Sequence, residues 1–202
     1  MILLACAVGK ELSFFKSAPH VEMLVTGIGP IEASACVSRA LAQSPYSLVI
    51  NAGIAGAFEG AAEIGDGVVI SEEFVELGLE TGAAISLPDG ARVIQRVSSD
   101  LTLVDRMVEN GFASKRGLTV SRVTATGASA KRLAAYGVDV ESMEGFAVLR
   151  AAEIAGVPAI EVRGISNIVT DREHSRWNFS KGVEGLENVL TSLLSIVTTL
   201  DE

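Results

Sequence analysis

Short runs of hydrophobic residues alternate with longer stretches in which hydrophobic residues recur at helical spacing. Strands are predicted at residues 2–8, 21–26 and 47–51, and the uninterrupted hydrophobicity of the first is typical of a strand that helices cover on both faces. Pro30 is well placed to start a helix that continues through residues 32–42. Because strands and helices alternate along the chain, the sequence predicts a three-layered α/β fold.

The rest of the chain continues this alternation with shorter elements. The pattern predicts a turn at residues 65–67, strands at 68–71 and 118–126, helices at 97–109, 128–135 and 183–200, and loops at 81–91 and 170–179. The second of these loops, TDREHSRWNF, is polar, charged and aromatic. The sequence contains no repeat, low-complexity tract or internal linker, so we expect residues 1–202 to form a single domain.

The stretch from residue 140 to residue 167, VESMEGFAVLRAAEIAGVPAIEVRGISN, is central to the prediction of a site. A helix is predicted to begin at Glu144 and to end at Gly156 and Pro158. A buried strand follows and is predicted to stop at a polar tip, residues 163–167. This unit places a carboxylate at its start and a guanidinium and an amide at its end. We therefore expect a small-molecule pocket between the two ends.

Three of the predicted strands end in residues that suit a binding site. Glu11 follows the first strand, and glycine turns follow the second (Gly27 and Gly29) and the third (residues 52–56). Ligands gather at the carboxyl ends of strands in open α/β sheets, and glycine lets the backbone approach them closely. Each feature also has a structural explanation, a solvated helix residue for Glu11 and tight turns for the glycines. The dinucleotide-binding fingerprint is incomplete, because Glu32 stands at its third glycine position.

The composition narrows the classes of function. The chain is 49% hydrophobic and 20% charged, as expected for a globular protein, and its net charge of −9 argues against a nucleic-acid partner. Its apolar runs fall far short of the roughly 20 residues that span a membrane, and its N-terminus lacks the basic segment of a signal peptide. Cys6 and Cys36 are expected to be buried free thiols in a reducing cytoplasm. No cysteine and histidine cluster has metal-binding spacing, and we expect neither a metal nor a cofactor.

Four segments of the sequence together resemble one family. They are AVGKEL with Glu11, VTGIGP, INAGIAGAF, and the pair ESMEGFA and VRGISN. In this order, and over nearly the whole chain, they are similar to the purine nucleoside phosphorylase and nucleosidase superfamily, which implies a three-layer αβα fold with a central mixed sheet. The most specific part is Met143-Glu144 followed by RGIS from Arg163. Within the superfamily, SMEGF and ISN followed by DREHSRWNF most resemble the futalosine hydrolases.

This resemblance implies a reaction and the residues that carry it. The reaction is hydrolysis of the N-glycosidic bond of a 6-oxopurine nucleoside, futalosine, to hypoxanthine and dehypoxanthine futalosine in menaquinone biosynthesis. Glu144 matches the glutamate that binds the ribose hydroxyls and opposes positive charge on the sugar, and Glu11 matches the carboxylate that deprotonates the attacking water. Met143 matches a residue that packs against the ribose. The other positions implied are Arg163 near Glu11 and the nucleophile, Gly53 in the second glycine turn, and the backbone of Thr126 and Gly127 beside the base.

Asn167 departs from the pattern of the methylthioadenosine nucleosidases, which carry an aspartate there. An asparagine cannot deliver a proton to nitrogen 7 of a purine. Its NH₂ group can donate to a 6-oxo group, however, while its C=O accepts from a protonated nitrogen 7. We therefore predict hypoxanthine or guanine as the base. We expect 6-amino substrates to be poor, because mismatched buried polar groups stay unpaired.

Other departures concern the nucleophile and the 5′ group. Phosphorylases of the superfamily hold phosphate with arginines near the glycine turns, but residues 26–34 and 51–58 contain no Arg or Lys, so water is the expected nucleophile. Ile54 stands where the nucleosidases have a serine, and Ser142 replaces an acidic residue, a change for which we have no physical account. The polar loop is either solvated or offers groups for the carboxylated aromatic part of futalosine: Arg172, His174 and Arg176 for the carboxylate, and Trp177 for the ring.

Three hypotheses follow from these residues. The first is a futalosine-type hydrolase, and the second is a methylthioadenosine/S-adenosylhomocysteine nucleosidase or a purine nucleoside phosphorylase. The third is a non-catalytic module that binds nucleosides. The presence of both Glu11 and Glu144 favours catalysis, since a pure binder has less need of two acids at the ribose. Relatives form dimers or larger assemblies, so we also expect a homodimer or larger homo-oligomer.

Overall fold

The computed structural model describes residues 1–78, 90, 93–171, 173 and 176–198. Within these ranges the strands are β1 (Ile2–Cys6), β2 (Val21–Val25), β3 (Leu48–Ala57), β4 (Gly67–Val75), β5 (Arg96–Ser98), β6 (Ala113–Thr119), β7 (Val140–Ser142) and β8 (Ala159–Ile168). The helices are α1 (Pro30–Gln43), α2 (Leu101–Glu109), α3 (Gly127–Ala134), α4 (Gly145–Ala155) and α5 (Phe179–Thr198), and a 3₁₀ helix, η1 (Gly9–Leu12), follows β1.

These strands form one mixed sheet, and part of it closes on itself. The order is β2-β1-β3-β7-β6-β4-β5, with β8 paired to both β3 and β4. β8 runs parallel to β3 and antiparallel to β4, whereas β7 runs antiparallel to β3 and parallel to β6. Since β4 also pairs with β6, the strands β3, β8, β4, β6 and β7 close into what we call the strand ring. Apolar side chains from four of these strands pack together: Ala55, Ala57, Val68, Ile70, Val140 and Ile165.

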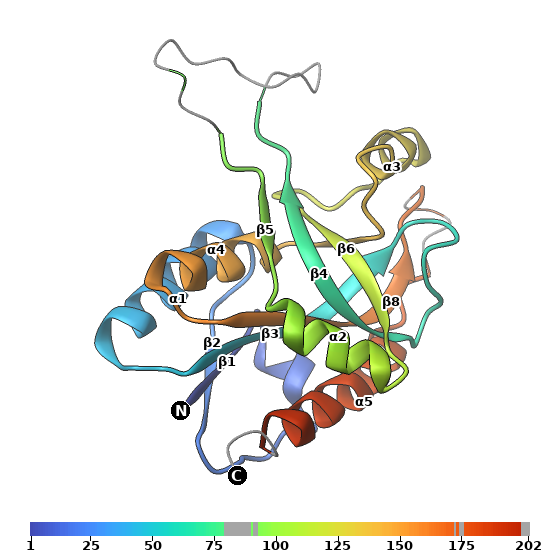
Figure 1. Ribbon diagram of the computed structural model, residues 1–202. Coiled ribbons are helices and arrows are strands. Elements are labelled where there is room, and N and C mark those ends of the chain that lie inside the picture. The colour runs from blue at the N-terminus through green and yellow to red at the C-terminus, as the bar shows by residue number, and fades with distance from the viewer. Residues whose placement is uncertain (79–89, 91–92, 172, 174–175, 199–202) are drawn as a thin grey trace.

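Helices cover the sheet from both sides (Figure 1). α1 and α4 pack against each other on one side, and α2 and α5 lie on the other. In β1, Leu3 and Ala5 belong to the core under α1 and α4, whereas Leu4 and Cys6 belong to the core under α2 and α5. Successive side chains of a strand point to opposite faces, so one hydrophobic strand serves two cores. The predicted three-layer αβα fold with a central mixed sheet is confirmed.

The helices lie close to their predicted ranges where capping signals mark their ends. α1 starts at Pro30, and α4 ends where Gly156 adopts a left-handed conformation with φ of 69°, which glycine allows without strain. The range 97–109 was only partly right, because it begins within β5 and continues into α2. Asp100 starts α2 by accepting a hydrogen bond from the N–H of Leu103 at 3.0 Å. α5 begins at Phe179, earlier than predicted.

The strands differ more from the prediction. The prediction of a glycine turn at residues 52–56 is wrong, because β3 continues through these residues to Ala57. The polar tip predicted at residues 163–167 is part of β8 and does not follow the strand. β3 and β8 pair with each other along these segments, and β7 pairs with β3 at Gly56 and Ala57, so both strands continue without a turn. β6 lies earlier than the predicted strand at 118–126, and β7 was not predicted. The loop predicted at 81–91 falls, except for Gly90, outside the described residues.

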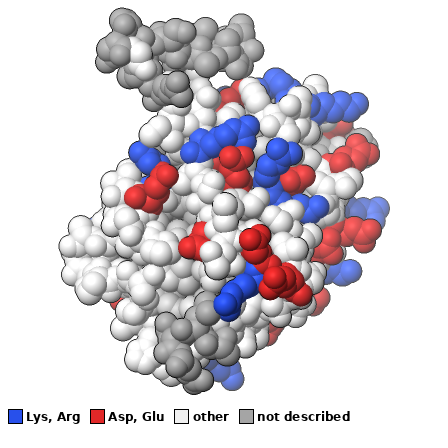
Figure 2. Space-filling view, in the orientation of Figure 1, with Lys and Arg blue, Asp and Glu red and all other residues white. Residues whose placement is uncertain are grey.

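The surface carries charges of both signs. On the face in Figure 2, Lys and Arg side chains lie among Asp and Glu side chains. Arg96 and Glu72 pair at 2.5 Å and Arg132 and Glu76 at 2.6 Å; all four are partly exposed, so each pair contributes little to stability. No helix in the described ranges is long and apolar enough to cross a bilayer. Both cysteines are free, but only Cys6 is fully buried.

Candidate active site

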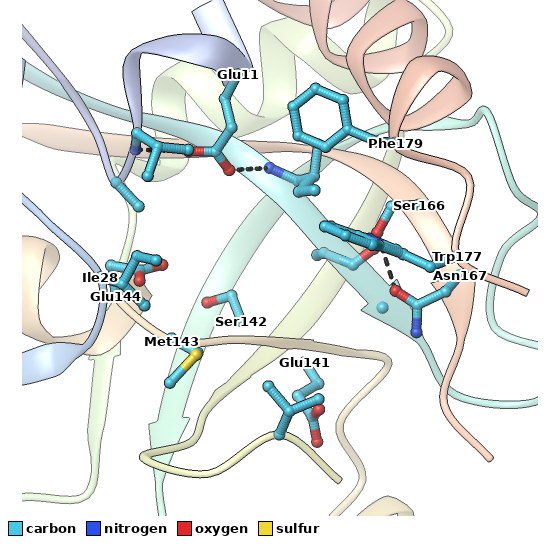
Figure 3. Close-up of a pocket in the computed structure, with 16 residues that line it drawn as sticks. Glu11, Ile28, Glu141, Ser142, Met143, Glu144, Ser166, Asn167, Trp177 and Phe179 are labelled. Atoms are coloured by element: carbon cyan, nitrogen blue, oxygen red, sulfur yellow. Dashed lines mark hydrogen bonds between the residues drawn. The ribbon is translucent and has the colours of Figure 1, made fainter. Parts of the chain in front are cut away.

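A cavity of about 310 Å³ lies where η1, β3, β8 and the junction of β7 with α4 come together. Several of the residues predicted to form a site line it: Glu11, Met143, Glu144, Asn167 and Trp177. Glu11 and Glu144 lie on one side of the cavity, and Asn167 and Trp177 lie on the other (Figure 3). The structure therefore brings together residues from opposite ends of the chain, such as Glu11 and Trp177.

Glu11 is held in place by two backbone donors. Its Oε1 accepts a hydrogen bond from the N–H of Ile54 at 3.0 Å, and its Oε2 accepts one from the N–H of Val8 at 3.1 Å. The side chain is almost fully buried. Burial raises the pKa of Glu11 above its ordinary value, although these hydrogen bonds and Arg163 act in the opposite direction. A carboxylate with a raised pKa and a fixed orientation is suited to accept a proton.

Glu144 is the residue that precedes α4, and it also receives a backbone donor. Its Oε1 accepts a hydrogen bond from the N–H of Gly29 at 2.9 Å. Gly29 has φ of 97° and Gly27 has φ of 86°, a region that favours glycine. The first predicted glycine turn therefore exists, and it orients a carboxylate of the cavity. Met143 lies beside Glu144 and is half-buried.

Arg163 and Gly53 lie behind the cavity and do not line it. Arg163 is in the middle of β8 and only 1% exposed, and its Nε donates to Oε1 of Glu161 at 2.7 Å. A Cβ on Gly53 would lie 2.4 Å from Nη1 of Arg163 and 2.9 Å from Oε1 of Glu11. Gly53 therefore leaves the space in which the guanidinium approaches Glu11. Burial lowers the pKa of Arg163, but nearby carboxylates, Glu161 first, raise it above its ordinary value, so Arg163 stays charged.

Asn167 lies near the end of β8, across the cavity from Glu11. Its Oδ1 accepts a hydrogen bond from the hydroxyl of Ser166 at 2.9 Å, and its Nδ2 lies against Gly56, where a Cβ would be 2.9 Å away. The Ser166 contact and the narrow space at Gly56 orient the amide. Oδ1 can accept a further hydrogen bond, because a carbonyl oxygen has two lone pairs.

A third carboxylate of the cavity, Glu141, was not predicted from the sequence. Glu141 pairs with Gly56 on one side of β3, and Asn167 pairs with Gly56 on the other side. Its Oε1 accepts a hydrogen bond from the N–H of Thr124 at 3.0 Å, and its Oε2 accepts one from the Thr124 hydroxyl. Burial raises the pKa of Glu141. Other lining residues that were not singled out include Ile28, Val123 and Phe179.

Thr126 and Gly127 do not line this cavity, contrary to the prediction. The Thr126 hydroxyl accepts a hydrogen bond from the N–H of Ser129 at 3.2 Å and so caps α3. The N–H of Gly127 donates to Asp171 at 2.8 Å. Both residues are thus engaged at the start of α3, and among the described residues Val123 is the part of this segment that reaches the cavity.

The segment predicted as a polar loop contributes two aromatic residues to the cavity, Trp177 and Phe179, the second of which is the first residue of α5. Trp177 lines it while remaining 60% exposed, and its ring meets the ring of Phe179 edge to face at 5.8 Å. Arg176 is exposed and lies outside the lining. Arg172 and His174 lie outside the described residues.

Comparisons with known proteins place the chain in a family. The Phosphorylase superfamily profile matches residues 9–199. The chain is 32% identical over 196 residues to a futalosine hydrolase of Streptomyces coelicolor, which covers 87% of this chain and 79% of that protein. It is 31% identical over 180 residues to a futalosine hydrolase of Thermus thermophilus, covering 85% of this chain and 80% of that protein. The chain belongs to the phosphorylase superfamily.

Solved structures of this superfamily share the fold. An S-adenosylhomocysteine nucleosidase from Streptococcus pyogenes, in complex with 5-methylthiotubericidin, has a TM-score of 0.79 at 19% identity and covers 96% of this chain and 95% of its own. A 5′-methylthioadenosine/S-adenosylhomocysteine nucleosidase from Colwellia psychrerythraea, in complex with adenine, has a TM-score of 0.78 at 18% identity and covers 96% and 94%. At these identities the likeness establishes the α/β fold.

The charge of the cavity bears on whether it suits phosphate, the nucleophile of a phosphorylase, or a sugar that becomes positively charged during cleavage. The described lining residues include Glu11, Glu141 and Glu144 and contain no Lys or Arg. Among the described lining residues a phosphate ion would meet three carboxylates and no cationic side chain. Positive charge developing on a bound sugar would instead be stabilised.

Proposed function

We propose that the chain is an N-glycosyl hydrolase that splits futalosine into hypoxanthine and dehypoxanthine futalosine, a step of menaquinone biosynthesis. The observation that carries this proposal is the arrangement of Glu11 and Glu144 on one side of a cavity whose other side presents the amide of Asn167. The similarity to two futalosine hydrolases supports the choice of substrate.

Glu144 binds the ribose hydroxyls in this proposal, and Met143 packs against the sugar. Cleavage of the N-glycosidic bond gives the sugar the character of an oxocarbenium ion. A buried carboxylate close to that cation lowers the barrier, because water does not screen the attraction. The backbone donor from Gly29 keeps Glu144 in one orientation during the reaction.

Glu11 acts as the general base toward water. The raised pKa of Glu11 makes it a better proton acceptor than an exposed glutamate. Water is preferred to phosphate as the nucleophile, since the described lining has three carboxylates and no cation. Arg163 is close to Glu11 and supplies the charge that keeps Glu11 ionised before the proton is taken.

Asn167 selects the base by its hydrogen-bonding pattern. Its NH₂ group donates to the 6-oxo group of hypoxanthine, and Oδ1, which already accepts from Ser166, accepts from protonated nitrogen 7. A 6-amino group would place donor against donor, which leaves buried polar groups unpaired. At the mouth, Trp177 stacks on the aromatic part beyond the 5′ carbon, and Arg176, the preceding residue, is the proposed partner of its carboxylate.

An apolar surface beside the cavity suggests how copies of the chain assemble. Ile28 lines the cavity and is 62% exposed, Ile31 on α1 is 81% exposed, and Met23 and Val25 are exposed on the edge strand β2. Water-exposed apolar surface of this kind favours association, so we propose a homodimer or larger homo-oligomer through this face. Sedimentation of a monomer at all accessible concentrations would refute it.

The two free thiols support a reducing compartment such as the cytoplasm.

Release of the purine base from futalosine, inosine and methylthioadenosine, with and without phosphate, tests the function; the base is hypoxanthine for the first two and adenine for the third. We expect fast release from futalosine, slower release from inosine, poor cleavage of methylthioadenosine, and no dependence on phosphate. Strict dependence on phosphate would identify a phosphorylase. Equal cleavage of methylthioadenosine would identify the alternative nucleosidase, and binding without cleavage would identify a nucleoside-binding module.

A further inference from the structure

Three charged side chains lie completely inside the protein, away from the cavity lining. Glu73 on β4 and Glu161 on β8 are 0% exposed, and Arg163 on β8 is 1% exposed. All three belong to the strand ring, in which β4 and β8 pair antiparallel. Buried charges of this kind are costly unless they are paired, so their arrangement requires an explanation.

The two carboxylates face each other over the first residue of α4. A Cβ on Gly145 would lie 2.5 Å from Oε1 of Glu73 and 2.6 Å from Oε2 of Glu161. Neither of these oxygens has a hydrogen-bond partner in the described part of the chain. Gly117, opposite Glu73 in the β4–β6 ladder, also leaves room, because a Cβ there would be 1.8 Å from Oε1 of Glu73. Two glycines thus make the space in which the acids meet.

A single proton between the two acids resolves this arrangement. Two carboxylates this close in a dry interior cannot both be ionised, whereas a protonated carboxyl group donates to an ionised one and satisfies both oxygens. Glu161 accepts from the cation Arg163, so it is the ionised partner, and Glu73 carries the proton. In agreement, burial and then Glu161 raise the pKa of Glu73 well above its ordinary value.

The acid pair connects to the surroundings of two of the three cavity carboxylates, Glu144 and Glu11. Toward Glu144, Oε2 of Glu73 accepts a hydrogen bond from the Thr119 hydroxyl at 2.7 Å, and that hydroxyl accepts one from the N–H of Phe146 in the first turn of α4, also at 2.7 Å. Toward Glu11, Glu161 holds the Nε of Arg163, whose Nη1 lies beside Glu11 over Gly53. One buried network therefore reaches both the first turn of α4, which follows Glu144, and Arg163, the counterion of Glu11.

We propose that Glu73 and Glu161 share one proton and act together as positioning residues, which hold Arg163 against Glu11 with a fixed total charge so that Glu11 remains available as the base. The role of Glu11 as base rests on the proposed function; the shared proton does not. The charged groups that act on Glu11 are Arg163 and Glu144, and Glu161 in turn acts on Arg163. The thiol of Cys6 also faces Glu11, but the pKa of this thiol is raised to about 12, so Cys6 stays neutral.

Infrared spectroscopy of the folded protein without substrate tests the shared proton. We expect the C=O stretching band of a protonated carboxylic acid at neutral pH in the wild type. The band should be lost in Glu73→Gln, in which an amide replaces the protonated acid. It should be unchanged in Glu72→Gln, the matched control, since Glu72 is the neighbour on β4 and pairs with Arg96 at the surface. Absence of the band in the wild type, or its survival in Glu73→Gln, overturns the proposal.

The pH profile of hypoxanthine release tests the positioning role. Glu73→Gln keeps the charge of the pair and should leave the acid limb of kcat/KM in place. The double variant Glu73→Gln/Glu161→Gln removes that charge and should move the limb down by about one unit, because Arg163 then favours ionised Glu11 more strongly. A limb that stays in place in the double variant, or one that moves equally in both, refutes the role.

If the double variant does not fold, a shifted limb in Glu73→Gln alone refutes the role, and an unchanged limb supports it. If no nucleoside is cleaved at all, the proposed function fails, while the infrared result still decides on the proton.

Discussion

Asn167 is the residue through which the cavity is proposed to distinguish purines, and its replacement by aspartate changes one heavy atom, the amide nitrogen. Asn167→Asp should raise kcat/KM for methylthioadenosine relative to inosine by about tenfold or more, because an acid can protonate nitrogen 7 while its other oxygen accepts from a 6-amino group. Ser166 can donate to either side chain. Initial rates of base release from the two nucleosides measure this ratio.

Asn178→Asp is the matched control for that substitution. Asn178 is exposed, and its Oδ1 accepts a hydrogen bond from the N–H of Lys181 at 3.1 Å, which a carboxylate would accept equally well. The ratio of the two substrates should therefore not change in this variant. If Asn167→Asp also leaves the ratio unchanged, Asn167 does not select the base.

The side chains of the cavity differ in how readily they can be predicted from the sequence. Glu11 and Glu144 could be predicted because each stands in a contiguous motif at the end of a recognisable element. Glu141 could not, since its burial depends on the pairing of a three-residue strand and on the distant donor Thr124. Thr126 does not line the cavity, and its contact in the structure, capping α3, is local.

Elements whose ends are marked by local chemistry were predicted better than those whose ends depend on pairing. The proline at the start of α1 and the glycine at the end of α4 act within one turn of helix. In contrast, β3 and β8 extend through glycine and polar residues because both are covered by neighbouring strands in the strand ring. A ring of strands cannot be inferred from hydrophobic periodicity, which describes one strand at a time.

The contact between β8 and α5 depends on the absence of a side chain at Gly164. A Cβ there would lie 1.8 Å from the carbonyl oxygen of Gly182 and 2.5 Å from the backbone nitrogen of Leu186. Backbone atoms of a helix cannot move aside individually, so Gly164→Ala should push α5 away from the strand. We expect the free energy of unfolding to fall by about 3 kcal/mol, measured by urea denaturation.

Gly9→Ala provides the control for that measurement. The nearest atom to a Cβ on Gly9 is Cγ2 of Val25 at 3.9 Å, an ordinary contact. Its unfolding free energy should stay within about 1 kcal/mol of the wild-type value. Equal losses in Gly164→Ala and Gly9→Ala would show that the close packing of β8 on α5 is not what stabilises this contact.

The whole molecule buries acids that would be ionised in water. Glu11, Glu73 and Glu141 are buried, and burial raises the pKa of each above the ordinary value of 4.5. Arg163 is the described buried cation close to Glu11 and Glu73. The protein as a whole also carries a net charge of −9. The raised pKa values make folding less favourable as the pH rises, because the unfolded chain releases these protons first, and the net negative charge adds self-repulsion.

This charge distribution predicts how stability depends on pH. A group whose pKa is raised on folding contributes stability that is complete below its unfolded pKa, here 4.5, and is lost as the pH rises toward its folded value. The free energy of unfolding should therefore decrease as the pH rises above about 4.5, by up to about 1.4 kcal/mol per pH unit for each group that titrates only when unfolded. Glu73 is the group whose pKa is raised well above its ordinary value, and Glu73→Gln removes its titration, since an amide does not titrate. Urea denaturation across this range should give a shallower slope for Glu73→Gln than for the wild type. An identical slope would mean that Glu73 is already ionised in the folded protein, which is incompatible with a proton held between Glu73 and Glu161.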